Sequence, residues 1–344
     1  MRYSFGKILI VSCCLAFSSL VRADWCSRNI SVDAKGKNVV RDRADRYRDS
    51  SPTPMKKLKT EGLLPGEGIR DASEIARKDF DKIIAFSYDW KLNGNRDSLN
   101  KAAIFIKSWT DLYEYSINPI DEANFDKFFE GYSIVRANIL EADRKSIDNW
   151  VINFSNAYFS ALNDIPRKKS DYTNWNSHRL LLAFSSAASV KDYKRIEGLR
   201  KYFSDQIFNL IDDKGETNDF KKRDSIHYVV YGLTPLVKTV LISRKFNFLS
   251  ENSDEMNRLK MAIDWLLPYI DGSVKHIEFE HTSVSFDKKR AKFGLKEYEN
   301  HEWDPQDAKN LFQYATYVDG RYEKYCDLIS CNKSAFVDSC YGTH

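Results

Sequence analysis

The sequence has few of the patterns that indicate strands, membrane spans or nucleic-acid binding. Alternating apolar and polar runs are scarce along its 344 residues, so helical periodicity is the main structural signal. Beyond the N-terminus, we find no segment apolar enough to predict a membrane-spanning helix. Lys and Arg number 53 against 49 Asp and Glu, so the chain lacks the strong positive field of a nucleic-acid-binding protein.

The first 23 residues have the features of a secretory signal peptide. A short basic region is followed by apolar or small residues from 8 to 20, and Val21-Arg22-Ala23 is an A-x-A-like cleavage site. A lipoprotein with Cys13 as its first residue is the alternative, but it would leave a very short apolar region. We therefore expect a periplasmic or secreted mature protein, residues 24–344, with a net charge of about +1.

Cysteine is confined to the two ends of the chain. Two of the six lie in the expected signal peptide, and the mature chain keeps Cys26, Cys326, Cys331 and Cys340. Four cysteines in an oxidising compartment predict two disulfides, with three connectivities open. Their spacing matches no standard zinc pattern. We expect them to tie down the termini.

Amphipathic helices are predicted along most of the mature chain. They cover residues 74–90, 99–115, 125–140, 147–162, 175–190, 196–211 and 256–269. The connections between them are short and polar, which favours antiparallel neighbours in a curved stack of helical hairpins. Four aromatic residues could form walls for sugar rings, but their helical spacing is more typical of a core: Trp90, Trp109, Tyr113 and Trp175.

Two stretches interrupt the helical pattern. Residues 50–70 hold three prolines, three glycines and three lysines, which predicts a long surface loop with a possible role as a lid. A flexible segment near the mature N-terminus is the alternative. Residues 271–297 fit a small hairpin or an irregular loop. Their ligand-like side chains match no recognised metal motif, so we expect them at the surface: His276, Glu278, Glu280 and His281.

A polar cluster opens the otherwise apolar helix expected at residues 175–190. Asn174, Ser177 and His178 share one stripe of that helix, and Asn176 lies between them. Such a cluster is unusual in a simple core helix and makes these residues candidates for a binding site. Helix capping by an Asn or Ser, with a structural histidine, is the alternative.

A second cluster lies a short way along the chain. Lys221, Arg223, His227, Tyr228 and Tyr231 fall within about three helical turns. Nearby cations lower the cost of ionising a phenol, which helps a tyrosine to act as a base. A basic, solvated face with half-buried tyrosines is the alternative interpretation.

Together the two clusters resemble the bacterial alginate lyases of the helical-toroid type. That family has an Asn-His pair at the start of one helix and, later, a tyrosine followed directly by Ala-Leu-x-Pro-Leu. Here His178 matches the histidine, and Tyr231 is followed by Gly-Leu-Thr-Pro-Leu. Diffuse similarity extends from about Asp71 to Tyr322. The resemblance implies one all-α domain over residues 24–344, an incomplete (α/α) toroid or barrel of antiparallel helical hairpins.

The resemblance also implies cleavage of a uronic-acid polymer by β-elimination, with alginate (polymannuronate) as the leading substrate and no cofactor or metal. Neutralising the substrate carboxylate stabilises the enolate-like intermediate. We assign that role to His178 and Arg223, together with further substrate contacts at Asn174, Asn176, Ser177 and Lys221. Tyr231 is the expected base and acid, with Tyr228 as second choice. We expect a monomer that binds an acidic polysaccharide, although the sequence does not determine the oligomeric state.

Two positions depart from the family's pattern, and both concern recognition of the carboxylate. Ser177 stands where the family has Asn. The family's arginine lies seven residues before its tyrosine, a position occupied here by Asp224, with Arg223 adjacent and Lys221 seven before Tyr228. Lys lacks the bidentate fork of Arg. The alternatives are a lyase for another acidic polysaccharide, such as a glucuronate-containing capsule, a non-catalytic periplasmic binding protein, or a glycoside hydrolase with paired carboxylates.

Overall fold

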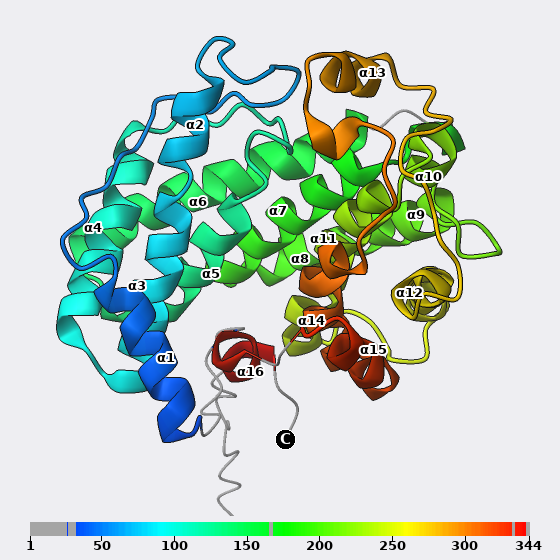
Figure 1. Ribbon diagram of the computed structural model, residues 1–344. Helices are drawn as coiled ribbons and strands as arrows, with labels where there is room; N and C mark the ends of the chain where they lie inside the picture. Colours follow the sequence, from blue (N-terminus) through cyan, green and yellow to red (C-terminus); the bar gives the residue numbers. More distant parts are fainter. Residues whose placement is uncertain (1–25, 27–31, 165–167, 332–333, 342–344) are drawn as a thin grey trace, which may run out of the picture.

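The computed structural model describes residues 26, 32–164, 168–331 and 334–341 (Figure 1). Regular structure in these ranges is helical, with isolated β-bridges at Ile211–Thr217 and Ile277–Glu302. The α-helices are α1 (Ala34–Asp45), α2 (Arg70–Ala76), α3 (Asp79–Asn93), α4 (Arg96–Leu112), α5 (Phe125–Val135), α6 (Glu141–Ala161), α7 (Asn174–Ser189), α8 (Tyr193–Gly198), α9 (Arg200–Leu210), α10 (Asn218–Arg223), α11 (Ile226–Ser243), α12 (Asp254–Ile270), α13 (Ser285–Lys292), α14 (Lys309–Val318), α15 (Glu323–Leu328) and α16 (Ala335–Tyr341). Short 3-10 helices lie at η1 (Arg136–Asn138), η2 (Leu162–Asp164), η3 (Lys169–Asp171), η4 (Arg244–Phe246), η5 (Lys296–Tyr298), η6 (Pro305–Ala308) and η7 (Gly320–Tyr322). The all-α prediction is confirmed, whereas the predicted signal peptide lies outside the described residues.

The helices form a curved double layer (Figure 1). In the inner row, α1, α3, α5, α7, α11 and α14 each pack on the next, while α4, α6, α9 and α12 pack behind them. Helices α7 and α11 are buried along nearly their whole length. These two buried helices stand at the centre of the arc, and the candidate clusters lie on the N-terminal part of α7, on α10 (Asn218–Arg223) and on the first two turns of α11.

The predicted helices correspond to real ones, with two corrections. The segment expected at 74–90 is broken between α2 and α3, and the one at 196–211 is broken between α8 and α9. Helix α11 was not among the amphipathic segments because it is apolar on nearly every side, as expected for a helix buried by its neighbours.

One helical segment does have the length and composition of a membrane span, contrary to our expectation. It covers Ile226–Phe246, the only such segment in the part of the chain that the structure describes. However, 83% of its most apolar window is buried inside the protein. Its apolar character is that of a core helix, since neighbouring helices cover it.

Residues 50–69 are irregular, as the prolines and glycines predicted. The segment is fastened to the core rather than loose. Asp121 accepts hydrogen bonds from the backbone N–H groups of Thr60 and Glu61, both at 2.7 Å, and Asp79 accepts one from the N–H of Thr53 at 2.6 Å. Movement of this segment as a lid stays a prediction.

The stretch at 271–297, expected as a hairpin or an irregular loop, contains helix α13, and its Ile277 forms an isolated β-bridge with Glu302. The expectation of surface positions was wrong for Glu278, which is fully buried. Its carboxylate accepts hydrogen bonds from the Ser225 hydroxyl and from the backbone N–H of Ile226, at 2.6 Å for the latter. It therefore holds the N-terminus of α11, where a negative charge is favoured by the helix dipole.

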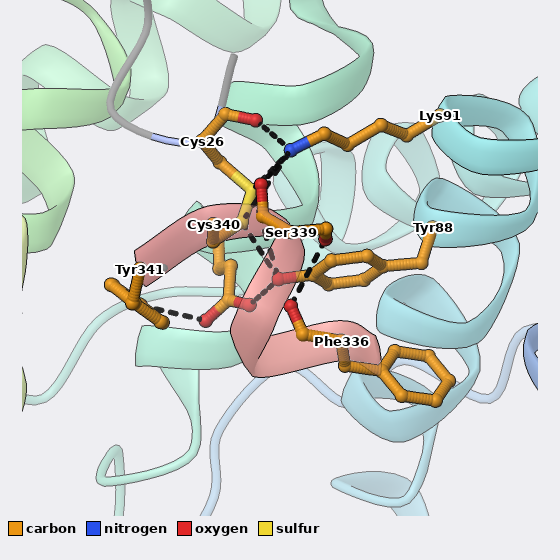
Figure 2. Close-up of a disulfide and its surroundings, with 8 residues drawn as sticks. Cys26, Tyr88, Lys91, Phe336, Ser339, Cys340 and Tyr341 are labelled. Carbon is orange, nitrogen blue, oxygen red and sulfur yellow. Dashed lines mark hydrogen bonds between the residues drawn. A yellow bond between two sulfur atoms is a disulfide. The ribbon is translucent and has the colours of Figure 1, made fainter. Parts of the chain in front are cut away.

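Helix α16 closes the gap between the first and last helices of the inner row (Figure 1). The disulfide Cys26–Cys340 anchors it, and Cys326–Cys331 forms a second bridge. Figure 2 shows Lys91 reaching both chain ends, where its Nζ donates to the carbonyls of Cys26 and Ser339. The prediction that the cysteines pair and tie down the termini is confirmed.

Removing the Cys26–Cys340 bridge is expected to destabilise the protein strongly. The bridge joins residues 314 positions apart, whereas Cys326–Cys331 spans only 5, and loop-closure entropy grows with loop length. We expect the paired Cys26→Ser and Cys340→Ser changes to lower the free energy of unfolding by about 2–5 kcal/mol. The matched variant without Cys326–Cys331 should lose less. Equal losses in thermal denaturation of the two variants would contradict this entropic explanation.

Candidate active site

Two cavities meet between the first turns of α7 and α11. The larger, about 510 Å³, lies between α1, α3 and α5 on one side and α11, α14 and α16 on the other. The smaller, about 250 Å³, lies between residues 60–77, the start of α7 and the segment around α13. Three residues line both cavities, Arg77, His227 and Tyr231. We call the two cavities together the cleft, and these three residues mark their junction.

His178 and Tyr231 face one another across α7 and α11. Their ring centroids are 4.3 Å apart, and both side chains line the larger cavity. His178 is only 8% exposed, and neither of its ring nitrogens has a hydrogen-bond partner among the described residues. Burial lowers the pKa of His178 to about 4, so the imidazole is neutral at neutral pH and presents one N–H and one lone pair.

Pro235 shapes this junction from within α11. It stands four residues after Tyr231 and has no N–H, so the Tyr231 carbonyl lacks its usual helical partner. The His178 ring lies against this carbonyl, whose partial negative charge opposes part of the fall in the His178 pKa. The proline of the Leu-x-Pro-Leu pattern thus leaves the Tyr231 carbonyl as a free hydrogen-bond acceptor beside His178.

Tyr231 is partly exposed to the cleft, and its hydroxyl makes no hydrogen bond with a described residue. Burial raises the pKa of Tyr231 to about 12, and Arg77 and Arg290 oppose the rise. We had expected Lys221 and Arg223 to favour the ionised phenol. The structure corrects this, since the main cations that act on Tyr231 are Arg77, from the turn between α2 and α3, and Arg290, from α13.

Tyr228 lies one turn earlier, and its hydroxyl is already engaged. Arg290 donates a hydrogen bond to it at 2.9 Å, and the Arg223 guanidinium carbon lies 3.8 Å from the centre of its ring. Burial raises the pKa of Tyr228 well above its usual value. Tyr228 therefore forms part of the wall of the smaller cavity, with its polar atom turned to an arginine.

Arg223 reaches the smaller cavity but is bound to a buried carboxylate. Its Nη1 donates to both oxygens of Asp287, at 2.5 and 2.7 Å. The next residue, Asp224, is left-handed with φ 51°, and its carboxylate accepts the backbone N–H of His281 at 2.7 Å. Position 224, where the family pattern has arginine, therefore belongs to a turn that holds the 276–281 segment.

The polar cluster at the start of α7 divides between two sides of the helix. Asn174 lines the smaller cavity and is held by Asp219, which accepts from its backbone N–H at 2.7 Å and its side-chain Nδ2 at 2.6 Å. Ser177 accepts instead from Gln206 on α9 at 3.0 Å, and Asn176 accepts from Arg179 at 2.9 Å. The structure does not place Asn176 or Ser177 on the cleft.

Lys221 is also away from the cleft. Its side chain is exposed on α10 and forms an ion pair with Asp212. Among the aromatic candidates, Trp175 lines the smaller cavity, while Trp109 and Tyr113 are buried in the core. The core interpretation is thus confirmed for Trp109 and Tyr113.

Sequence analysis identified Arg223 but missed the other cations that the fold brings to the cleft. The larger cavity is lined by Arg43, Arg77, Lys127 and Lys238, and the smaller by Arg70, Arg77, Arg223 and Arg290. Most lie on helices far from α7 and α11 in the chain, so no local pattern could have identified them. In the described ranges, no group of three or more His, Cys, Asp or Glu side chains is arranged to hold a metal ion.

Comparison with known proteins identifies the family. A family model described as alginate lyase matches residues 24–276 of this chain. The chain belongs to the alginate lyase family. It is therefore a polysaccharide lyase, as the resemblance of its motifs predicted. No curated protein sequence matches the lyase.

Two solved structures share the fold of the lyase at low sequence identity. An alginate lyase from Bacteroides ovatus has a TM-score of 0.63 and 11% identity, over 90% of this chain and 94% of that one. Alginate lyase A1-III from Sphingomonas species A1 has a TM-score of 0.53 and 13% identity, over 94% and 95% respectively. These likenesses confirm the predicted toroid of helical hairpins.

The lyase is expected to lose stability in acid through His178. The unfolded histidine takes up a proton near its usual pKa of about 6.5, whereas the folded one does so near pH 4, so folding becomes less favourable as the pH falls between these values. The loss should approach about 3 kcal/mol at pH 4. A His178→Gln variant lacks this site, so its stability relative to the wild type should improve as the pH falls. A difference that does not change with pH in chemical denaturation would contradict the assignment.

Proposed function

We propose that this lyase cleaves a uronic-acid polymer by β-elimination at the junction of the two cavities, with Tyr231 as base and acid. The observation that carries the proposal is the position of the Tyr231 hydroxyl. The hydroxyl has no partner in the described protein, the Tyr231 side chain lines both cavities, and the centre of its ring lies 4.3 Å from that of the neutral His178. A polymer chain running from one cavity to the other would pass this hydroxyl.

The reaction breaks two bonds and forms one double bond. Ionised Tyr231 removes the C5 proton of the uronate, the C4–O bond breaks as the C4=C5 double bond forms, and the phenol returns the proton to the leaving oxygen. His178, as a neutral imidazole, offers an N–H to the carboxylate on which negative charge develops. Asn174, held by Asp219 at the edge of the smaller cavity, is placed to bind the same sugar or its neighbour.

The cleft is lined by as many acidic as basic side chains, so its cations act locally and not through a net positive charge. Arg77 lies at the junction with Tyr231, where it would meet a carboxylate of an acidic polysaccharide. Alginate, as polymannuronate, is the substrate that we propose first, since the family is named for it. A glucuronate-containing polymer is the second candidate, because Ser177 and Asp224 depart from the family's pattern.

The acids that cluster at residues 212–219 of the sequence are outside the lining of the cleft, so they do not supply the paired carboxylates of a glycoside hydrolase. Asp212 and Asp213 lie outside the cleft, in ion pairs with Lys221 and Arg258. Asp219 is bound to Asn174. We further propose that the lyase is exported as a monomer through cleavage after Ala23, to the periplasm or beyond, where its two disulfides would be stable.

One assay tests the reaction and its substrate. The purified mature protein is incubated with polymannuronate, polyguluronate and glucuronan, and the ultraviolet absorbance of the unsaturated product is followed. We expect absorbance to rise first with polymannuronate. New reducing ends without absorbance would instead indicate hydrolysis. Binding without either signal would favour a non-catalytic binding protein.

A further inference from the structure

We propose that Arg77 supplies the guanidinium group that binds the substrate carboxylate at the point of cleavage. This inference rests on the proposed β-elimination at Tyr231. It assigns the role that the family pattern gives to an arginine seven residues before the tyrosine, a position that is Asp224 in this chain. The replacement comes from a different part of the fold, the turn between α2 and α3.

The position of Arg77 sets it apart from the other arginines of the cleft. Together with His227 and Tyr231, it lines both cavities, whereas Arg43 lines only the larger and Arg70 only the smaller. A sugar placed against the Tyr231 hydroxyl therefore lies beside Arg77. The same proximity appears in the electrostatics, since Arg77 is the strongest opposing influence on the raised pKa of Tyr231.

Arg77 also keeps donors free for a ligand. Its Nη2 forms an ion pair with Glu74 at 2.5 Å, and its side chain is 26% exposed. No described residue accepts from its Nε or Nη1. A guanidinium held at one nitrogen is oriented by Glu74 and still presents N–H groups toward the cleft, as a carboxylate-binding arginine requires.

The two arginines nearest Tyr228 are less suited to the role. Arg223 gives Nη1 to both oxygens of the buried Asp287 and stacks on Tyr228. Arg290 donates to the Tyr228 hydroxyl and lies over the rings of Phe286 and Tyr298, at 4.3 and 4.5 Å. Both hold the wall of the smaller cavity together.

One cation at this place serves both halves of the reaction. Bound to the carboxylate, the guanidinium stabilises the negative charge that grows as the C5 proton leaves. Close to Tyr231, it also lowers the cost of the phenolate that removes this proton. Lysine keeps the charge but lacks the planar fork of arginine. An Arg77→Lys change should therefore preserve the stabilisation of the Tyr231 phenolate better than the binding of the substrate carboxylate.

The test compares three variants on two forms of one substrate. Arg77→Gln, Arg77→Lys and Arg223→Gln are assayed with the polyuronate that the wild type cleaves and with its methyl ester, in which the carboxylate charge is absent. Arg48→Gln, an exposed arginine outside the cleft, is the matched control for loss of one positive charge. Thermal denaturation checks that each variant is folded.

We expect Arg77→Gln to lower kcat/KM on the acidic polymer by about 100-fold, and by much less on the ester. Its rate should also reach its alkaline plateau at a higher pH than that of the wild type, and Arg77→Lys should recover part of this shift. An equal loss on both substrates, or a carboxylate-dependent loss in Arg223→Gln alone, would overturn the role of Arg77. A wild type inactive on every uronate polymer would overturn the proposed function as well.

Discussion

Replacing Tyr231 by Phe is expected to lower turnover by about 10²–10⁴-fold, the usual contribution of a general acid–base group. The change removes one oxygen and keeps the ring that packs 4.3 Å from His178. Because the Tyr231 hydroxyl bonds to no described residue, its loss leaves no buried group unsatisfied. The thermal midpoint should therefore change little, and rates of formation of the unsaturated product measure the effect.

Tyr228→Phe is the matched control for this prediction. The two tyrosines share one face of α11, but the Tyr228 hydroxyl accepts a hydrogen bond from Arg290. We expect this variant to retain activity within about tenfold of the wild type, with a stability loss of about 1–2 kcal/mol from the broken hydrogen bond. Strong inactivation of Tyr228→Phe, with Tyr231→Phe still active, would transfer the role of base to Tyr228.

Replacing Lys238 by Met is expected to destabilise the lyase by about 3–5 kcal/mol, the usual result of breaking a buried ion pair. Lys238 lies two turns after Tyr231 on α11, is 7% exposed and forms an ion pair with Asp126 on α5. Burial alone would lower its pKa, but the surrounding acids, with Asp126 the strongest, raise the pKa well above the usual value. The lysine is charged, and its removal leaves Asp126 buried without its cation.

A double variant separates the lost ion pair from the lost packing. Lys238→Met combined with Asp126→Asn removes both charges, so it should recover much of the stability that the single variant loses. Chemical denaturation, analysed with one common m-value for both variants, measures their free energies of unfolding. If the double variant were as unstable as the single one, packing rather than an unpaired carboxylate would explain the loss.

Other buried groups beside the Lys238–Asp126 ion pair also depend on the charge of Lys238. Glu130 lies close by, and burial raises its pKa while Lys238 opposes the rise. Glu130 also accepts hydrogen bonds from the hydroxyls of Tyr88 and Tyr341, the second at 3.3 Å, which links α5 to the disulfide-anchored α16. One lysine thus balances the charge of a network that joins the cleft to both chain ends.

Much of the fold could be predicted from the sequence because its signals are local. Helical periodicity depends on residues three and four apart, so it identified most helices of the double layer. It failed at α11, which is apolar overall and buried on nearly every side. The cysteines at the chain ends predicted tied termini but left three pairings open, and only the fold selected Cys26–Cys340.

The candidate site could be predicted only in part, for the same reason. Spacing along two helices identified His178 and Tyr231, and the Leu-x-Pro-Leu context ranked Tyr231 first. It also placed Ser177 on the same stripe as His178, yet Ser177 turns toward Gln206 on α9. A stripe of a helix is wide enough to include residues that face a neighbouring helix instead of a cavity.

The sequence by itself determined the helical class and the pairing of the terminal cysteines, and it proposed the histidine and tyrosine whose surrounding motifs resemble those of the family. Only the tertiary structure decided which cations surround that tyrosine. Arg223, close in sequence, is bound to Asp287, while Arg77, from the distant turn between α2 and α3, lines both cavities together with Tyr231. Charges act through space, and the fold brings the turn between α2 and α3 close to Tyr231 on α11. A pattern of residues that are neighbours in the sequence cannot show that Arg77 and Tyr231 lie close together in the fold.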